Sequence, residues 1–184
     1  VVGGAVVVAL LIQTFLFQAF YIPSQSMERT LVENDRVLVN KLAYRFGDVG
    51  RGDVVVFERS ADEVGPDGIK DLIKRVIAVP GDSLVIEGGK VAIDGEVLDE
   101  PYLEEGTVTT ESHGIVDPTD PTGTVHRCIA ADPCVVPEGY VFVMGDNRSD
   151  SRDSRFAEVG YIDQDAIVGR AFVRVWPLNR LGGL

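Results

Sequence analysis

The stretch LIKRVIAVPGD, residues 72–82, decides the fold class because it joins a β-branched run to an abrupt turn. Isoleucine and valine favour a pleated, half-buried strand, and a Pro-Gly pair ends one. Alternate side chains of a strand share a face, so Lys74 would lie on the same face as Leu72 and Val76. The stretch therefore predicts a core β-strand with one lysine on an otherwise apolar face.

Comparable strand signals occur along most of the chain. The glycines at 88–89 predict a hairpin, the Asp-Gly pair at 94–95 predicts a further turn, and no segment after the N-terminal one has helical periodicity. These features predict a mainly β, antiparallel domain. Its expected strands include RVLVNK (36–41), DVVVF (53–57), SLVIE (83–87), KVAID (90–94), YVFVMGD (140–146) and AIVGRAFVRVW (166–176).

Residues 1–22 form an apolar segment without a charged side chain. As a helix it would extend roughly 33 Å, close to the bilayer core of about 30 Å. A cleaved signal peptide is the alternative, but no small-x-small site follows the apolar run. We therefore favour a retained membrane anchor. The chain has neither an initiator methionine nor a basic residue ahead of the apolar segment. We therefore expect it to begin inside a longer protein.

The composition narrows the class of partner. The 184 residues carry a net charge of −12, and 45% of them are hydrophobic, which is enough for one domain with a core. A phosphate backbone is bound by clustered Lys and Arg, so the acidic balance argues against nucleic acid. Anionic lipid headgroups would add little to membrane binding beyond insertion of the apolar segment.

Cys128 and Cys134 lie close together in HRCIAADPCV. No second Cys/His pair accompanies them, which argues against zinc. A local disulfide and two free thiols both remain open, and a disulfide that closes so short a loop would stabilise the fold little.

Two serines follow the apolar segment, Ser24 and Ser26 in PSQSM, and a nucleophilic serine needs a base. His113 and His126 lie in the turn-rich segment 106–137, where a fixed catalytic geometry is not expected. A lysine can replace histidine if burial lowers its pKa from about 10.4 to about 8. Lys74 is the candidate, and the alternative is a lysine that is ion-paired or extends to solvent.

The stretch MGDNRSDSRDSRF, residues 144–156, alternates acids, serines and arginines after an expected strand. A calcium loop could use Asp146, Asp150 and Asp153, but the interleaved arginines oppose a divalent cation. A solvated turn is a second interpretation. The third is that these hydroxyls and ion pairs brace an active site.

Together, these stretches resemble type I signal peptidases, the membrane-bound serine proteases that remove signal peptides from secreted proteins. That family has PSxSM after a transmembrane helix, then a strand with KR and PGD, then GDNRxxSxDSR. Here the corresponding stretches are PSQSM (23–27), KRVIAVPGD (74–82) and GDNRSDSRDSR (145–155). Similarity covers nearly the whole chain, including RVLVNKLAY (36–44) and RGDVVVF (51–57).

The resemblance implies an antiparallel fold shared with SOS-repressor proteases, an N-terminal transmembrane helix, a small inserted cap, and no metal or other cofactor. It also implies a role for each matching side chain. Ser26 would be the nucleophile and Lys74 the general base, while the Ser24 hydroxyl and the Ser26 N–H would form the oxyanion hole. The supporting residues would be Ser151, which orients the lysine, and the pairs Asp153–Arg155 and Asp146–Arg75; the substrate pocket would use Phe20, Ile22 and Ile73.

We expect residues 1–16 to form the C-terminal part of the anchor and 17–82 the first part of a catalytic β core. Residues 83–137 would form a hairpin and inserted cap, to whose residues we assign no role, and 138–184 the second part of the core. The resemblance implies signal peptides of preproteins and membrane lipid as partners, at the extracytoplasmic face of the bacterial plasma membrane. The oligomeric state stays open.

Two positions depart from the family's common pattern: Gln25 replaces a glycine and Arg29 a proline. Neither would carry the chemistry, so we expect altered substrate preference or no effect. Three other functions are considered. One is a self-cleaving SOS-repressor-type protease, against which the membrane segment argues. Another is a conjugation-type maturation peptidase, which would have one dedicated substrate. The third is a membrane-tethered β domain that binds partners without catalysis.

Overall fold

The computed structural model describes residues 16–59, residue 64 and residues 68–184. Apart from Leu16, the expected membrane anchor at residues 1–16 lies outside this part of the chain. Within the described ranges, no helix is long and apolar enough to span a bilayer. The membrane anchor and the four-part division of the chain therefore stay predictions.

The main sheet has the strand order β1-β2-β13-β3-β4-β11-β12, with β14 paired to β13. Each pairing between its strands is antiparallel, as the sequence predicts. The last long strand, β13, lies between β2 and β3 and so joins the two halves of the chain. The bounds are β1 Phe17–Tyr21, β2 Arg36–Asn40, β3 Val54–Glu58, β4 Asp71–Ala78, β11 Tyr140–Met144, β12 Ile162–Asp163, β13 Ile167–Trp176 and β14 Gly182–Gly183.

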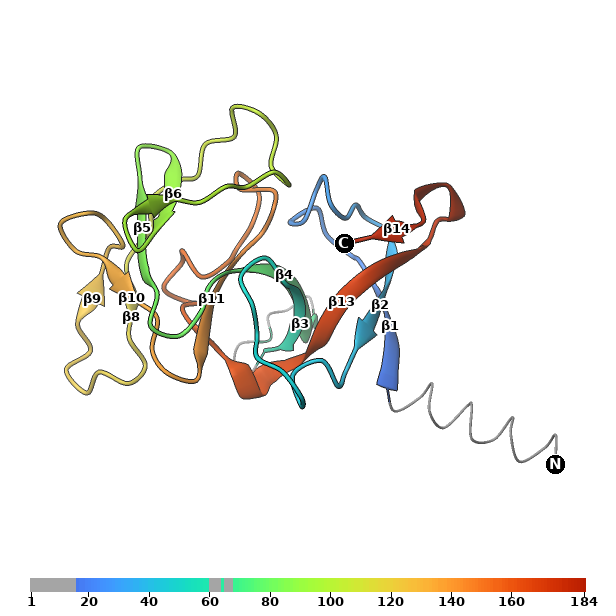
Figure 1. The fold of residues 1–184 in the computed structure, drawn as a ribbon, viewed down its shortest axis with the longest axis horizontal. Coiled ribbons are helices and arrows are strands. Elements are labelled where there is room, and N and C mark those ends of the chain that lie inside the picture. The colour runs from blue at the N-terminus through green and yellow to red at the C-terminus, as the bar shows by residue number, and fades with distance from the viewer. Residues whose placement is uncertain (1–15, 60–63, 65–67) are drawn as a thin grey trace.

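Residues 83–137, the predicted inserted region, contribute two smaller sheets. One has the order β10-β5-β6-β7, and the other is the hairpin of β8 and β9. They lie at one end of the molecule, β1, β2 and β14 lie at the other, and β3 and β4 lie between them (Figure 1). The bounds are β5 Ser83–Glu87, β6 Lys90–Ile93, β7 Glu96–Val97, β8 Ile115–Val116, β9 Val125–His126 and β10 Cys134–Val135, and two 3-10 turns are η1 Gln164–Ala166 and η2 Leu178–Arg180.

The strands predicted from apolar alternation are confirmed, and SLVIE forms β5 over the whole of 83–87. The predicted hairpin at the glycines of 88–89 joins β5 to β6. The segment 106–137 is mostly irregular, as expected, but it also contains the short strands β8, β9 and β10. Two-residue strands carry too few alternating positions to be distinguished from a loop in the sequence.

The central strand β3 is buried on both faces, which explains its continuous apolar sequence. Val55 and Phe57 belong to one buried cluster, while Val54 and Val56 belong to another. A third cluster joins the cap sheet to the end of the main sheet through Leu84, Ile86, Phe142 and others. Because apolar contacts continue from the main sheet into the cap, the two pack as one structure.

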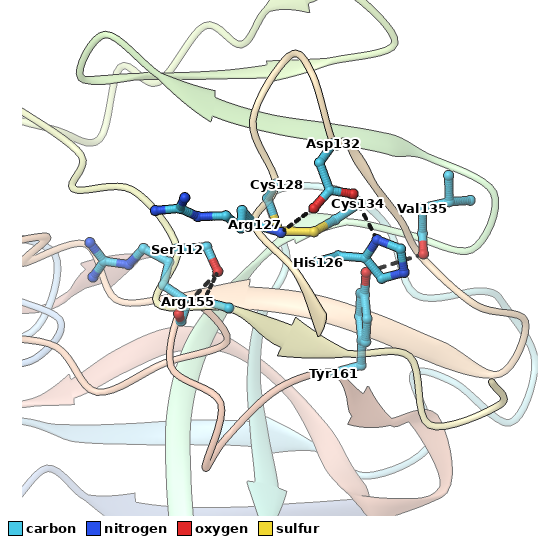
Figure 2. The surroundings of a disulfide bond; sticks show 10 residues. Ser112, His126, Arg127, Cys128, Asp132, Cys134, Val135, Arg155 and Tyr161 are labelled. Atoms are coloured by element: carbon cyan, nitrogen blue, oxygen red, sulfur yellow. Dashed lines mark hydrogen bonds and ion pairs between the residues drawn. A yellow bond between two sulfur atoms is a disulfide. The ribbon is translucent and has the colours of Figure 1, made fainter. Parts of the chain in front are cut away.

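Cys128 and Cys134 form a disulfide, which decides between the two alternatives left open by the sequence (Figure 2). The Ile86 N–H donates to the Cys128 carbonyl at 2.6 Å, and the Tyr161 hydroxyl donates to the Val135 carbonyl at 3.1 Å. These bonds attach the disulfide loop to the cap sheet on one side and to the segment before β12 on the other.

Candidate active site

Ser26 and Lys74, 48 positions apart in the chain, meet in the structure. Lys74 lies in the middle of β4, and its Nζ donates a hydrogen bond of 2.8 Å to the Ser26 Oγ. The same Nζ donates to the Ile73 carbonyl at 3.0 Å. The lysine is only 3% exposed and the serine 8% exposed. Val76 and Leu72, the neighbours of Lys74 on its strand face, belong to one apolar cluster, so the prediction that Lys74 lies on an apolar face is confirmed.

Burial lowers the pKa of Lys74 from its ordinary value of 10.5 to about 8, because the charged ammonium loses its solvation. The carboxylates of Asp153 and Asp146 oppose this shift, since negative charge favours the protonated lysine. A neutral amine is therefore accessible in mildly alkaline solution. The alternative of a lysine that extends to solvent is wrong.

Buried apolar neighbours and backbone hydrogen bonds hold the segment that carries Ser26. Met27 and Leu31 are fully buried in the cluster that also holds Ile22. The Ser26 carbonyl accepts a hydrogen bond of 3.1 Å from the Asn147 N–H. The serine backbone is thus attached to the loop that follows β11, and its side chain faces the lysine.

Ser24 lies beside the pair, with its Oγ 3.4 Å from the Ser26 Oγ. A second hydroxyl therefore lies next to the Ser26 side chain. Its expected role in the oxyanion hole stays a prediction. Of the two unusual positions nearby, Gln25 is exposed, and Arg29 forms an exposed ion pair of 3.1 Å with Glu104 of the inserted region.

The expected pair of Arg75 and Asp146 is present and buried. Arg75 Nε donates to Asp146 Oδ1 at 2.8 Å, and Arg75 Nη2 donates to Oδ2 at 2.7 Å. The Thr30 hydroxyl donates to the same carboxylate at 2.5 Å. The pair therefore joins β4 to the loop after β11 and to the segment that follows Ser26.

The second expected pair, Asp153 with Arg155, is also buried. Arg155 Nε donates to Asp153 Oδ1 at 2.8 Å, and Asp153 Oδ2 accepts from the Gly145 N–H at 3.0 Å. A Cβ on Gly145 would lie 2.3 Å from both the Ser151 Oγ and the Ser26 carbonyl oxygen. The loop therefore approaches Ser26 so closely that only glycine fits at this position.

The structure rejects two interpretations of residues 144–156. The carboxylates of Asp146 and Asp153 are occupied by arginines, and within the described ranges no acidic cluster suits a metal ion, so the calcium loop is wrong. Most of the stretch is buried, so it is no solvated turn. Ser151 is buried, but its Oγ has no hydrogen-bond partner among the described residues, and its orientation of Lys74 stays a prediction.

A groove of about 850 Å³ passes over Ser24, Ser26 and Lys74. Ile73 lines it, and also lines an adjoining groove of about 320 Å³ together with Phe20 and Ile22. The structure thus brings together the three residues that were predicted to bind substrate. Ile22 itself is 1% exposed, so its side chain forms the floor.

Sequence reasoning missed the contribution of the inserted region to this site. Glu100 forms a buried ion pair with Arg148, whose side chain is 0% exposed. The Tyr102 ring lies over the guanidinium of Arg75, with 4.0 Å between the ring centre and Cζ. The acidic DEPYLEE stretch (99–105) offers several carboxylates, and no sequence signal distinguishes the one that meets the arginine.

Comparison with known proteins identifies the family of the chain. The family model described as "Signal peptidase, peptidase S26" matches residues 1–176. The chain is 40% identical over its whole length to "Signal peptidase I" of Leptolyngbya laminosa, covering 80% of that protein. It is 38% identical to "Probable signal peptidase I-2" of Synechocystis sp. over 97% of this chain and 72% of that protein. "Signal peptidase IB" of Staphylococcus aureus is 35% identical, with coverage of 97% and 87%.

Among solved structures, the chain is similar to a signal peptidase I from Enterococcus faecalis V583. The identity is 26%, the match covers 67% of this chain and 97% of that one, and the TM-score is 0.45.

The chain is a serine peptidase and belongs to the signal peptidase family, peptidase S26. Its substrates are preproteins that carry signal peptides.

Proposed function

We propose that this protein is a membrane-bound endopeptidase that cleaves signal peptides at small-x-small sites with a dyad of Ser26 and Lys74. The observation that carries the proposal is the 2.8 Å hydrogen bond between the two side chains, made by a lysine that is 3% exposed. Ser26 needs a base to become nucleophilic, and a lysine with its pKa lowered to about 8 can accept the proton.

In the proposed reaction, neutral Lys74 takes the Ser26 proton while Oγ attacks the scissile carbonyl. The Ser24 hydroxyl and the Ser26 N–H stabilise the oxyanion, and one such donor contributes about 3–4 kcal/mol in other proteases. The resulting ammonium of Lys74 protonates the leaving amine, which breaks the peptide bond and leaves an acyl group on Ser26. Water, deprotonated by the same lysine, then hydrolyses the ester and regenerates the serine.

The free edge of β4 supports binding of an extended peptide at this site. Among the described strands, β11 pairs with β4 only from Arg75 onward, so Asp71–Lys74 has a strand partner on one side alone. A substrate that adds there as a strand would send alternate side chains toward the floor of Ile22 and Ile73. That geometry explains a requirement for small residues at two alternate positions.

Membrane anchoring would align the nucleophile with the cleavage site of the substrate. Four positions separate Ile22 from Ser26, so an anchor ahead of β1 keeps the nucleophile near the outer membrane surface. A signal peptide spans the same bilayer and brings its cleavage site to a similar height, which is a proximity effect. We therefore propose that the catalytic domain lies on the extracytoplasmic side of the bacterial plasma membrane.

The deciding experiment compares the full chain with its Ser26→Ala and Lys74→Arg variants, each reconstituted in lipid vesicles with a preprotein. Both variants should fold and should fail to cleave, because alanine has no nucleophile and guanidinium stays protonated. Mass spectrometry of the products locates the cut site. Processing by either variant at the normal rate would refute the dyad.

A further inference from the structure

The segment 100–113, which we call the strap, contacts buried arginines of β4 and of the stretch 144–156. Its side chains contact three of them: Glu100 and Thr109 bond to Arg148, Tyr102 stacks on Arg75, and Thr110 bonds to Arg155. The strap also reaches the backbone at Arg155, whose carbonyl accepts from the Ser112 hydroxyl (Figure 2).

Arg148 is buried and has one carboxylate partner among the described residues. Its Nη2 contacts Glu100 Oε1, and its Nη1 lies 3.3 Å from Glu100 Oε2 and 2.6 Å from the Thr109 hydroxyl. A buried guanidinium without a counter-charge is strongly unfavourable. Glu100 therefore makes it possible for Arg148 to stay inside the protein.

From Arg148, a short series of hydrogen bonds leads to the nucleophile. Arg148 Nε donates to the Gly145 carbonyl at 3.1 Å, which closes the loop 145–148. The Asn147 N–H of this loop donates to the Ser26 carbonyl at 3.1 Å, and its side-chain amide donates to the Gln25 carbonyl at 3.1 Å. The position of the Ser26 backbone thus depends on a loop that Arg148 holds in shape.

We propose that Glu100 is a positioning residue of the peptidase and acts on Ser26 through Arg148 and the loop 145–148. The inference rests on the proposed role of Ser26 as nucleophile. A displacement of about 1 Å in a reacting group can lower the rate about 100-fold, so a small relaxation of this loop is enough to slow acylation. The strap is then part of the catalytic apparatus, whereas the sequence alone assigned it no role.

The test compares Glu100→Gln with Glu105→Gln in the full chain. Both residues lie in the strap and both changes remove one negative charge, but Glu105 is exposed. We expect Glu100→Gln to lower kcat about tenfold with KM changed less than about twofold, because it affects positioning and leaves the groove intact. Acylation of Ser26 by a serine-directed inhibitor should slow by the same factor, and Glu105→Gln should match the parent.

A merely structural role predicts a different result. Glu100→Gln would then lower the melting temperature but keep the parent kcat when assayed well below that temperature, and this outcome would overturn the proposal. Glu100→Asp keeps the charge on a shorter side chain and should recover part of kcat. If Glu100→Gln does not fold, Thr109→Val removes only a hydroxyl from Arg148 and should show a smaller fall in kcat; an unchanged kcat would count against the proposal.

A double-variant comparison tests the route through Arg148. If Glu100 acts through that arginine, adding Glu100→Gln to Arg148→Gln should cause no further loss of kcat. If the double variant lost kcat by the product of the two separate factors, the route through Arg148 would be refuted. Ser26→Ala, assayed alongside, separates the proposed role of Ser26 from that of Glu100. Activity of that variant would refute the proposed nucleophile, while normal kcat of Glu100→Gln with an inactive Ser26→Ala would refute the positioning role alone.

Discussion

The Nζ of Lys74 donates to the Oγ of Ser26 without a carboxylate among its own hydrogen-bond partners in the described part of the chain. Asp146 and Asp153 are close enough to raise its pKa, but each carboxylate is paired with an arginine. Desolvation by burial is the largest influence on the pKa of Lys74 and outweighs the two carboxylates, so the lysine can act as a base.

The rate of cleavage should depend on pH through the protonation of Lys74. If Lys74 is the general base, as proposed, its neutral form is the active one; with a pKa of about 8, kcat/KM should then rise with pH and level off above about pH 8. A continuous cleavage assay from about pH 6 to about pH 10 measures the profile. The rate of Ser26 acylation by an inhibitor should follow the same curve. A midpoint near the ordinary lysine value of about 10.4 would contradict a buried, neutral base.

Lys74→Met should abolish cleavage and, at neutral pH, stabilise the fold. The pKa of Lys74 is lower in the folded state than in the unfolded state, so folding carries its full penalty below about pH 8, where both states are protonated. A shift from 10.5 to about 8 corresponds to about 3 kcal/mol, reduced by the two hydrogen bonds that methionine cannot make.

Denaturant unfolding at several pH values measures the effect. The free energy of unfolding of Lys74→Met should exceed that of the parent at pH 7 by about 1–3 kcal/mol. The difference should shrink as the pH rises from about 8 toward about 10.4, because the penalty disappears when the unfolded lysine also loses its proton. A less stable variant at pH 7 would show that hydrogen bonding outweighs desolvation at this site.

Much of the fold could be predicted because strand positions depend on local patterns. β3 is buried on both faces and reads as a continuous apolar run, and β5 alternates between buried and partly buried side chains. The place of β13 between β2 and β3 had no such signal. Its partners lie more than a hundred positions earlier, and an alternating pattern records which face is buried but not which strand is adjacent.

Some residues of the candidate site could likewise be predicted from the sequence, and others could not. Ser26 and Lys74 could be identified from their motifs, and Lys74 also from its place on an apolar strand face. Glu100 and Tyr102 could not, because their importance comes from the buried arginines that they meet across the cap boundary. A buried charge requires a partner, but the burial of Arg148 is itself a result of the tertiary fold.

Ser151→Ala should change activity more than stability. The Ser151 hydroxyl is buried and has no hydrogen-bond partner in the described part of the structure, so its removal deletes an unsatisfied polar group at little cost. If the hydroxyl orients Lys74 when substrate is bound, kcat should fall about tenfold or more while the melting temperature stays within about 2 °C. Ser149→Ala, at an exposed position of the same loop, is the control. An unchanged kcat would remove Ser151 from the mechanism.

Gly145→Ala should inactivate the enzyme through a single methyl group. The added Cβ would lie 2.3 Å from the Ser151 Oγ and from the Ser26 carbonyl oxygen, so the loop, the nucleophile segment or both must move. Overpacking of this kind costs about 1–3 kcal/mol, and the displaced Ser26 should lower kcat about 100-fold.

Gly182→Ala is the matched control for this substitution, since a Cβ there would meet no atom closer than 4.0 Å. Cleavage rate and melting temperature should both be measured for the two variants, with the assay run well below the lower melting temperature. The expected pattern is a large loss of kcat for Gly145→Ala and parent-like values for Gly182→Ala. If Gly145→Ala kept the parent kcat, the loop would tolerate displacement, and its contact with the Ser26 carbonyl would not position the nucleophile.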